Sequence, residues 1–186
     1  MPRLPRILST LDLPRAELDA LRLDGEVFPI GACVAPIDEV ANPTLRAAAL
    51  TAELPSRLIA EQRTAAWVWG AILDQPRPHE VCADIAARTR PSFDRRLRVR
   101  EVVLVHDDVV HLAGTAVTTP IRTAIDLARF AENWGADEIA IVKHLMEVGG
   151  FNALDCARSM NRRRNLPGKR LALGRIALCA PASLVS

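Results

Sequence analysis

The sequence predicts an α+β protein with a reduced winged-helix N-terminal unit over residues 1–52, followed by a mixed α/β domain over residues 53–186 whose last third is helical. Three observations predict this class. An early helix pattern is closed by Gly25 and followed by two short strand patterns. The middle of the chain alternates apolar and polar residues, as half-buried strands do. From Pro120 onward, apolar residues recur at helical spacing between capping residues.

Residues 14–36 predict a helix and then a hairpin. Pro14 can begin the helix, and Gly25 lies on its C-terminal side, where glycine is favoured. Residues 26–30 and 32–36 read as two short strands around a turn. A helix, a glycine and a hairpin form the end of a winged helix, although the first 13 residues readily supply less helix than a full winged helix has.

The next elements are short. Asn42 and Pro43 predict a helix with asparagine as N-cap and proline in the first turn. A strand over 58–60 and a helix over 62–70 follow, and Gly70 ends that helix. The strands expected after them span residues 80–85, 97–105, 109–112 and 115–118.

The segment Val117 to Arg129 predicts a strand that runs directly into a helix. Thr119 is expected to be its N-cap, with Pro120 in the first helical position. Arg122 and Asp126 are four residues apart, so their side chains can meet on one face. We expect this pair to brace the helix against the sheet. The helices predicted in this last third span residues 120–131, 136–148, 153–163 and 169–179.

Composition favours a soluble, cytoplasmic protein without a cofactor or metal. The N-terminus lacks the apolar core of a signal peptide, and no apolar run approaches the roughly 20 residues that a membrane-spanning helix needs. The four cysteines form no C-x-x-C pair and are expected to be reduced thiols. His106 and His111 flank a hairpin turn, where a solvated pair is favoured over a metal site.

The sequence indicates that the protein is not an enzyme. Hydrolase and phosphate-loop motifs are absent. A restriction-type nuclease needs a carboxylate two residues before a lysine, which together hold the metal and polarise the attacked group. Lys143 and Lys169 are preceded at that spacing by Ile141 and Pro167, which excludes the standard arrangement.

Net charge is only +2, so the basic character is local and comes from two arginine clusters. The first holds Arg88, Arg90, Arg95, Arg96, Arg98 and Arg100, of which the last three share one face of a predicted strand. The second holds Arg162, Arg163, Arg164, Lys169 and Arg170 around a Pro-Gly turn. Both patterns suit phosphates or an acidic partner, but both are also typical of ordinary solvated surfaces.

Trp67 and Trp69 are two residues apart, so one helix stripe cannot hold both. One is expected in the core and the other as a packing bridge.

Three blocks together resemble a known family over roughly residues 10–175. They are the helix and hairpin of 14–36, the block Arg63-Thr-Ala-Ala-Trp-Val-Trp-Gly70, and residues 114–129. In this order and spacing the chain resembles the AbiEi family of bacterial antitoxins, in its actinobacterial form. The motif residues that we expect to be structural are Arg63, Trp69, Thr119, Arg122 and Asp126.

The resemblance implies a function in two parts. It implies a winged helix that binds double-stranded promoter DNA and a larger antitoxin domain that neutralises a nucleotidyltransferase-type toxin. The residues that we expect to contact DNA are Arg3, Arg6, Arg15, Arg22, Arg96, Arg98, Arg100, Arg162, Arg163, Arg164, Lys169 and Arg170.

The predicted recognition helix departs from this pattern. Residues 15–25 carry a net charge of −1, whereas a helix docked against phosphates should be neutral or basic. Either the wing is degenerate, or DNA contact falls to Arg3, Arg6 and the later clusters. The alternative function is a protein-interaction module that does not bind DNA.

Overall fold

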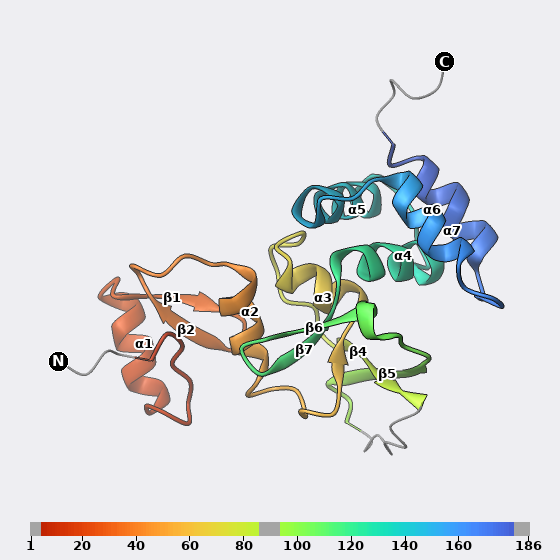
Figure 1. The fold of residues 1–186 in the computed structure, drawn as a ribbon. Coiled ribbons are helices and arrows are strands. Elements are labelled where there is room, and N and C mark those ends of the chain that lie inside the picture. The colour runs from red at the N-terminus through yellow and green to blue at the C-terminus, as the bar shows by residue number, and fades with distance from the viewer. Residues whose placement is uncertain (1–4, 86–93, 181–186) are drawn as a thin grey trace.

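A computed structural model describes residues 5–85 and 94–180 (Figure 1). A five-stranded sheet has the order β5-β4-β3-β7-β6, and β1 and β2 form a separate hairpin. The strands are β1 (Val27–Ile30), β2 (Cys33–Pro36), β3 (Ile59–Ala60), β4 (His79–Asp84), β5 (Leu97–Val102), β6 (Val109–Leu112) and β7 (Thr115–Thr118). The helices are α1 (Arg15–Leu23), α2 (Pro43–Leu50), α3 (Gln62–Val68), α4 (Pro120–Phe130), α5 (Ala136–Gly149), α6 (Ala153–Asn161) and α7 (Lys169–Ala177). The α+β prediction is confirmed.

The N-terminal unit consists of α1 packed on the hairpin β1–β2. Its small core is formed by Leu8, Leu18, Val27 and Val34. Leu8 also exchanges two backbone hydrogen bonds with Val34, at 2.8 and 2.9 Å, which fastens the N-terminal segment to β2. In the described part of the chain α1 is the single helix before the hairpin, so a winged helix stays a prediction.

A first core joins the hairpin to the sheet through α2. The Asn42 side chain accepts from the Leu45 amide at 2.9 Å, so the predicted N-cap is confirmed. Leu45 and Leu50 pack in one cluster with Trp67 of α3 and Val117 of β7. The proposed division after residue 52 therefore falls inside a shared core.

A second core lies between α4 and the three C-terminal helices, which cover α4 on its side away from the sheet (Figure 1). Trp69 packs against both cores, and its indole N–H donates to the Thr118 carbonyl at 2.9 Å. Trp67 is fully inside the first core. The prediction of one core tryptophan and one bridging tryptophan is confirmed. In the described ranges, no helix is both long and apolar enough to cross a membrane.

Glu53 joins the end of α2 to β4. His79 Nε2 lies 3.3 Å from one carboxylate oxygen, and Gln75 donates to the other at 2.9 Å. Burial pushes the pKa of Glu53 upward, but the hydrogen bonds from His79 and Gln75 and the charge of Arg77 outweigh it. The pKa is held at about 2, below the ordinary value of 4.5.

This depressed pKa predicts a loss of stability in acid. The Glu53 carboxylate stabilises the fold fully above pH 4.5, and its contribution is lost as the pH falls through about 2. The free energy of unfolding, measured by urea titration between pH 6 and pH 2, should fall less steeply with acidification in Glu53→Gln than in the wild type. If the free energy of unfolding falls equally steeply in the two proteins, Glu53 does not have the depressed pKa assigned to it.

Candidate functional site

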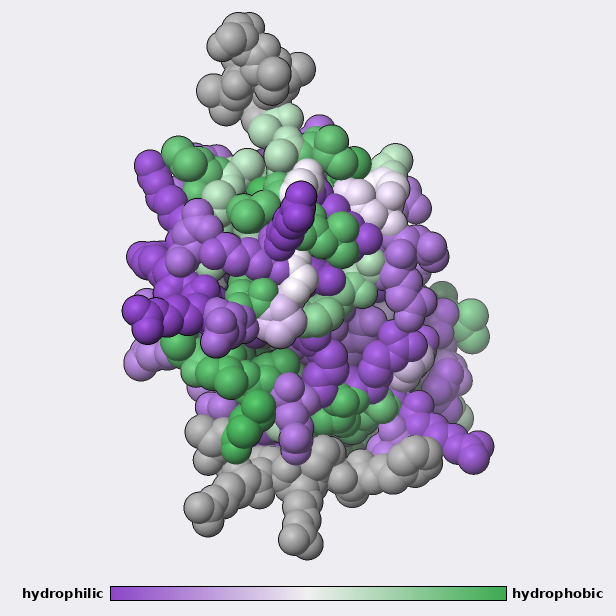
Figure 2. All heavy atoms as spheres, turned by 90° about the vertical axis from the view of Figure 1, so that its right-hand side faces the viewer, coloured by the Kyte–Doolittle hydropathy of each residue, from purple (hydrophilic) through white to green (hydrophobic). Residues whose placement is uncertain are grey.

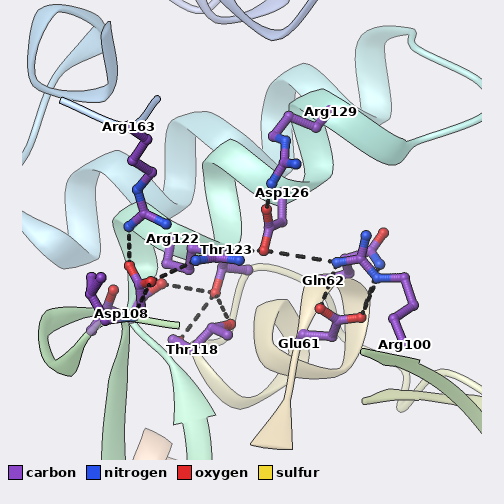
Figure 3. A network of polar contacts seen from close by, with 12 residues as sticks. Glu61, Gln62, Arg100, Asp108, Thr118, Arg122, Thr123, Asp126, Arg129 and Arg163 are labelled. Carbon is purple, nitrogen blue, oxygen red and sulfur yellow. Dashed lines mark hydrogen bonds and ion pairs between the residues drawn. The ribbon is translucent and has the colours of Figure 1, made fainter. Parts of the chain in front are cut away.

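A buried network of ion pairs lies where α4 meets the sheet (Figure 3). Arg122 donates from Nε to Asp126 at 2.7 Å and from an amino nitrogen to Asp108 at 2.6 Å. Arg129 donates to the other Asp126 oxygen at 2.8 Å. Side-chain exposure in these four residues is 6% or less. The predicted Arg122–Asp126 pair is confirmed, and through Asp108 it braces α4 against the turn before β6.

The start of α4 differs from the prediction in one respect. Thr119 is wrong as a side-chain N-cap, because its hydroxyl lies 3.5 Å from the Asp107 carbonyl and forms no capping bond. The Thr123 hydroxyl instead lies within hydrogen-bond distance of the Thr118 and Thr119 carbonyls, at 3.1 and 2.9 Å. This hydroxyl donates to carbonyls and caps no backbone N–H group, but it joins the first turn of α4 to the end of β7.

Two further arginines join the network from other elements. Arg100 of β5 donates two hydrogen bonds to Glu61, at 2.7 and 2.6 Å, and lies 3.9 Å from Asp126. Arg163, in the loop after α6, pairs with Asp108. The network thus links β5, α4 and the loop between α6 and α7.

The partners of Asp108 favour the ionised form of its carboxyl group. Burial alone would raise the pKa of Asp108. Hydrogen bonds from Arg163 and from the Val105 amide, with the charge of Arg122, outweigh burial and lower that pKa.

Glu61 and Asp108 were not predicted from the sequence as members of this network, because neither has its arginine partner within helical spacing.

Phe130, at the end of α4, lies beside this network. The guanidinium carbon of Arg100 is 3.9 Å from the ring centroid and that of Arg129 is 4.4 Å from it. Cation–π contacts of this kind fix the planes of both arginines.

A cleft of about 710 Å³ opens between β5, the end of α4 and the loop between α6 and α7. The face in Figure 2 shows hydrophobic patches set among hydrophilic ones. Exposed apolar side chains in the cleft include Ile85, Val103 and Val105. Its charged lining is Arg100, Glu101, Arg122, Arg129, Arg162, Arg163 and Arg164.

The structure brings part of the predicted DNA-contact set together here. Arg100, Arg162, Arg163 and Arg164 line the cleft, whereas Lys169 and Arg170 begin α7 nearby in sequence. Arg162, Arg164 and Arg170 are exposed, and within the described ranges their side chains form no hydrogen bond or ion pair.

The other arginines that were predicted to contact DNA either pair with carboxylates or lie away from the cleft. The pairs are Arg6 with Glu39, Arg15 with Asp19, Arg96 with Asp94, and Arg98 with Glu80. Arg6, Arg15 and Arg22 belong to the N-terminal unit, at the other end of the molecule from α6 and α7 (Figure 1). Arg3, Arg88 and Arg90 lie outside the described residues.

Arg63 has a structural contact, as predicted. Its guanidinium donates to Glu138 of α5 at 3.2 Å, and its backbone N–H donates to Glu80 of β4 at 2.9 Å. It therefore ties α3 to the sheet and to the helical layer.

The described residues hold no group of three or more histidine, cysteine, aspartate or glutamate side chains that could bind a metal. His106 is fully exposed. The cysteines Cys33, Cys82, Cys156 and Cys179 are buried and unpaired, and burial raises the pKa of all four thiols. These thiols are poor nucleophiles at neutral pH.

Residues 58–167 match a family model described as the AbiEi antitoxin C-terminal domain. Among solved structures, a similar chain is the RV2827C protein from Mycobacterium tuberculosis, at 15% identity and a TM-score of 0.36. The alignment covers 94% of this chain and 75% of that one. A search of curated proteins gave no significant match.

Proposed function

Because the chain belongs to the AbiEi antitoxin family, we propose that it neutralises a nucleotidyltransferase-type toxin and represses its own operon by binding promoter DNA. The observation that carries the proposal is the family match over residues 58–167. This segment contains the buried network and every residue that lines the cleft between β5, α4 and the loop between α6 and α7, called the arginine cleft below.

Toxin neutralisation is tested by co-expression. The toxin for this test is a nucleotidyltransferase-type protein encoded beside the gene for this chain, expressed from an inducible promoter. Growth arrest by the toxin should be relieved when the full chain is co-expressed. Arrest that persists although the chain is folded and abundant would reject the antitoxin role.

The basic surface around the loop between α6 and α7 supports DNA contact. Arg162, Arg164 and Arg170 present charge that no described side chain neutralises. By contrast, α1 carries Glu17 and Asp19, and Asp19 already pairs with Arg15. We therefore assign promoter contact to the loop between α6 and α7 and the start of α7, and not to α1.

We expect Arg162→Ala/Arg164→Ala to weaken promoter binding by at least ten-fold at moderate salt. Fewer counterions are released when fewer phosphates are neutralised, so the slope of log affinity against log salt should decrease in magnitude by about 2. Arg163 is left intact because it holds Asp108. Mobility shifts with the protein's own upstream DNA at several salt concentrations measure both quantities.

The control is Arg15→Ala/Arg22→Ala, which removes the same charge from α1. It should leave promoter affinity within two-fold. If this control weakens binding and the loop variant does not, α1 is the DNA-reading element and our assignment is wrong.

A second function is favoured by a groove of about 420 Å³ on the N-terminal unit. Leu13 and Leu21 lie in the groove with Glu17, Asp24 and Glu26. An apolar groove with acidic side chains suits a basic protein segment better than DNA. Absence of any promoter shift at low salt would reject DNA binding and leave a protein-interaction module.

A further inference from the structure

The arginine cleft has a charge excess that its own residues do not balance. Six arginines line it, together with the carboxylate of Glu101. Three carboxylates lie behind the arginines as their ion-pair partners: Glu61, Asp108 and Asp126. Among the described residues, six positive charges thus face four negative charges, so two positive charges remain. A concave site with this excess of positive charge favours a dianionic ligand.

The arginines are also held in fixed positions. Arg100 is fastened to Glu61 through two nitrogens, and its third nitrogen makes no hydrogen bond to the described residues. Arg163 is fastened to Asp108 through one nitrogen. Their side chains remain 23% and 22% exposed. Buried carboxylates therefore orient guanidinium groups that still have N–H donors to offer, which suits the bidentate recognition of phosphate.

Another part of the lining is apolar and exposed. Val103 is 71% exposed, Ile85 is 55% exposed and Val105 is 53% exposed. A duplex backbone presents phosphates and sugars, which would leave these side chains uncovered. A ligand with a phosphate at one end and a flat, weakly polar body at the other would cover both parts. The volume of about 710 Å³ lies within the usual range for small-molecule sites.

We propose that this cleft binds a nucleoside phosphate. The phosphate contacts Arg162, Arg164 and the free donors of Arg100, and the base lies against Val103 and Val105. This site adds a small-molecule ligand to the proposed function. Arg162 and Arg164 also belong to the surface assigned to the promoter, so nucleotide and promoter DNA should compete for them, whereas the contact of the base with Val103 and Val105 is separate from promoter binding.

The test is isothermal titration calorimetry of the full chain at physiological salt. The probes are the four ribonucleoside mono- and triphosphates, with inorganic phosphate and adenosine as partial ligands. At least one nucleotide should bind ten-fold or more tightly than either partial ligand, because only the nucleotide engages both parts of the cleft. No nucleotide binding, or binding no tighter than that of inorganic phosphate, would overturn the proposal.

Two variants separate the two parts of the site. Arg162→Ala/Arg164→Ala should weaken the nucleotide and inorganic phosphate alike, by ten-fold or more. Val105→Ser should weaken the nucleotide several-fold while leaving the affinity for phosphate and for promoter DNA unchanged. Arg15→Ala/Arg22→Ala is the charge-matched control and should bind as the wild type does. Loss of nucleotide binding in this control, or unchanged binding in the loop variant, would place the ligand outside the cleft.

An acidic protein segment is the competing occupant. Oligoglutamate that displaces the bound nucleotide at equal charge concentration would reject nucleotide specificity. Amide hydrogen exchange gives an independent readout: residues 100–105 and 162–167 should gain protection with the nucleotide. Protection confined to other segments would count against the site.

Discussion

Replacing Asp126 with alanine is expected to lower the free energy of unfolding by about 3–5 kcal/mol, because it leaves buried arginine charge uncompensated. Asp126 is fully buried and accepts hydrogen bonds from Arg122 and Arg129, with Arg100 at 3.9 Å. Urea unfolding monitored by circular dichroism measures the loss. A value below about 1 kcal/mol would show that the network is not a main source of stability.

Asp19→Ala is the matched control, since Asp19 also pairs with an arginine four residues away but on an exposed helix face. Asp19→Ala should lower the free energy of unfolding by about 0.5 kcal/mol or less, because exposed ion pairs on helices contribute little. Asp126→Asn distinguishes charge from shape. It keeps the side-chain volume and one carbonyl acceptor, and should fall between Asp126→Ala and the wild type.

Trp69→Ala is expected to lower the free energy of unfolding by about 3–5 kcal/mol, because the Trp69 ring packs against both cores. Trp69→Phe should cost about 1 kcal/mol, because it keeps an aromatic ring and loses the hydrogen bond to the Thr118 carbonyl. Both values come from the same urea titrations. Equal losses in the two variants would mean that the hydrogen bond, and not the ring, joins the cores.

Local patterns predicted most of the elements. Asn42-Pro43 located the start of α2, and the stripe after Pro120 located α4, because capping and periodicity depend on a few neighbouring residues. The Arg122–Asp126 pair was predictable for the same reason, since both residues lie on one helix.

The remaining parts of the site depend on long-range contacts. Glu61 meets Arg100 across 39 positions, and Asp108 meets Arg163 across 55. The sequence indicated Arg96, Arg98 and Arg100 as one basic face. In the structure each is paired with a carboxylate. Arg96 pairs with Asp94, two residues away, whereas the partners of Arg98 and Arg100 are Glu80 and Glu61, which only the arrangement of the strands brings close. Thr119 is the N-cap residue of α4 as predicted, but its side chain forms no capping bond, because its hydroxyl lies beside the Asp107 carbonyl, 12 residues earlier in the chain.

The core that α2 shares with the sheet limits where this protein can be joined to a segment of another protein in a chimera. A chimera that takes a foreign N-terminal segment and joins it at residue 52 would import a new α2, whose side chains would have to fit Trp67 and Val117. A junction before Asn42 keeps the cap and the packing of α2 with its own sheet. The transferable module is therefore α1 with its hairpin, and even this module must preserve Ile30, Cys33 and Ala35 on the face that enters the core.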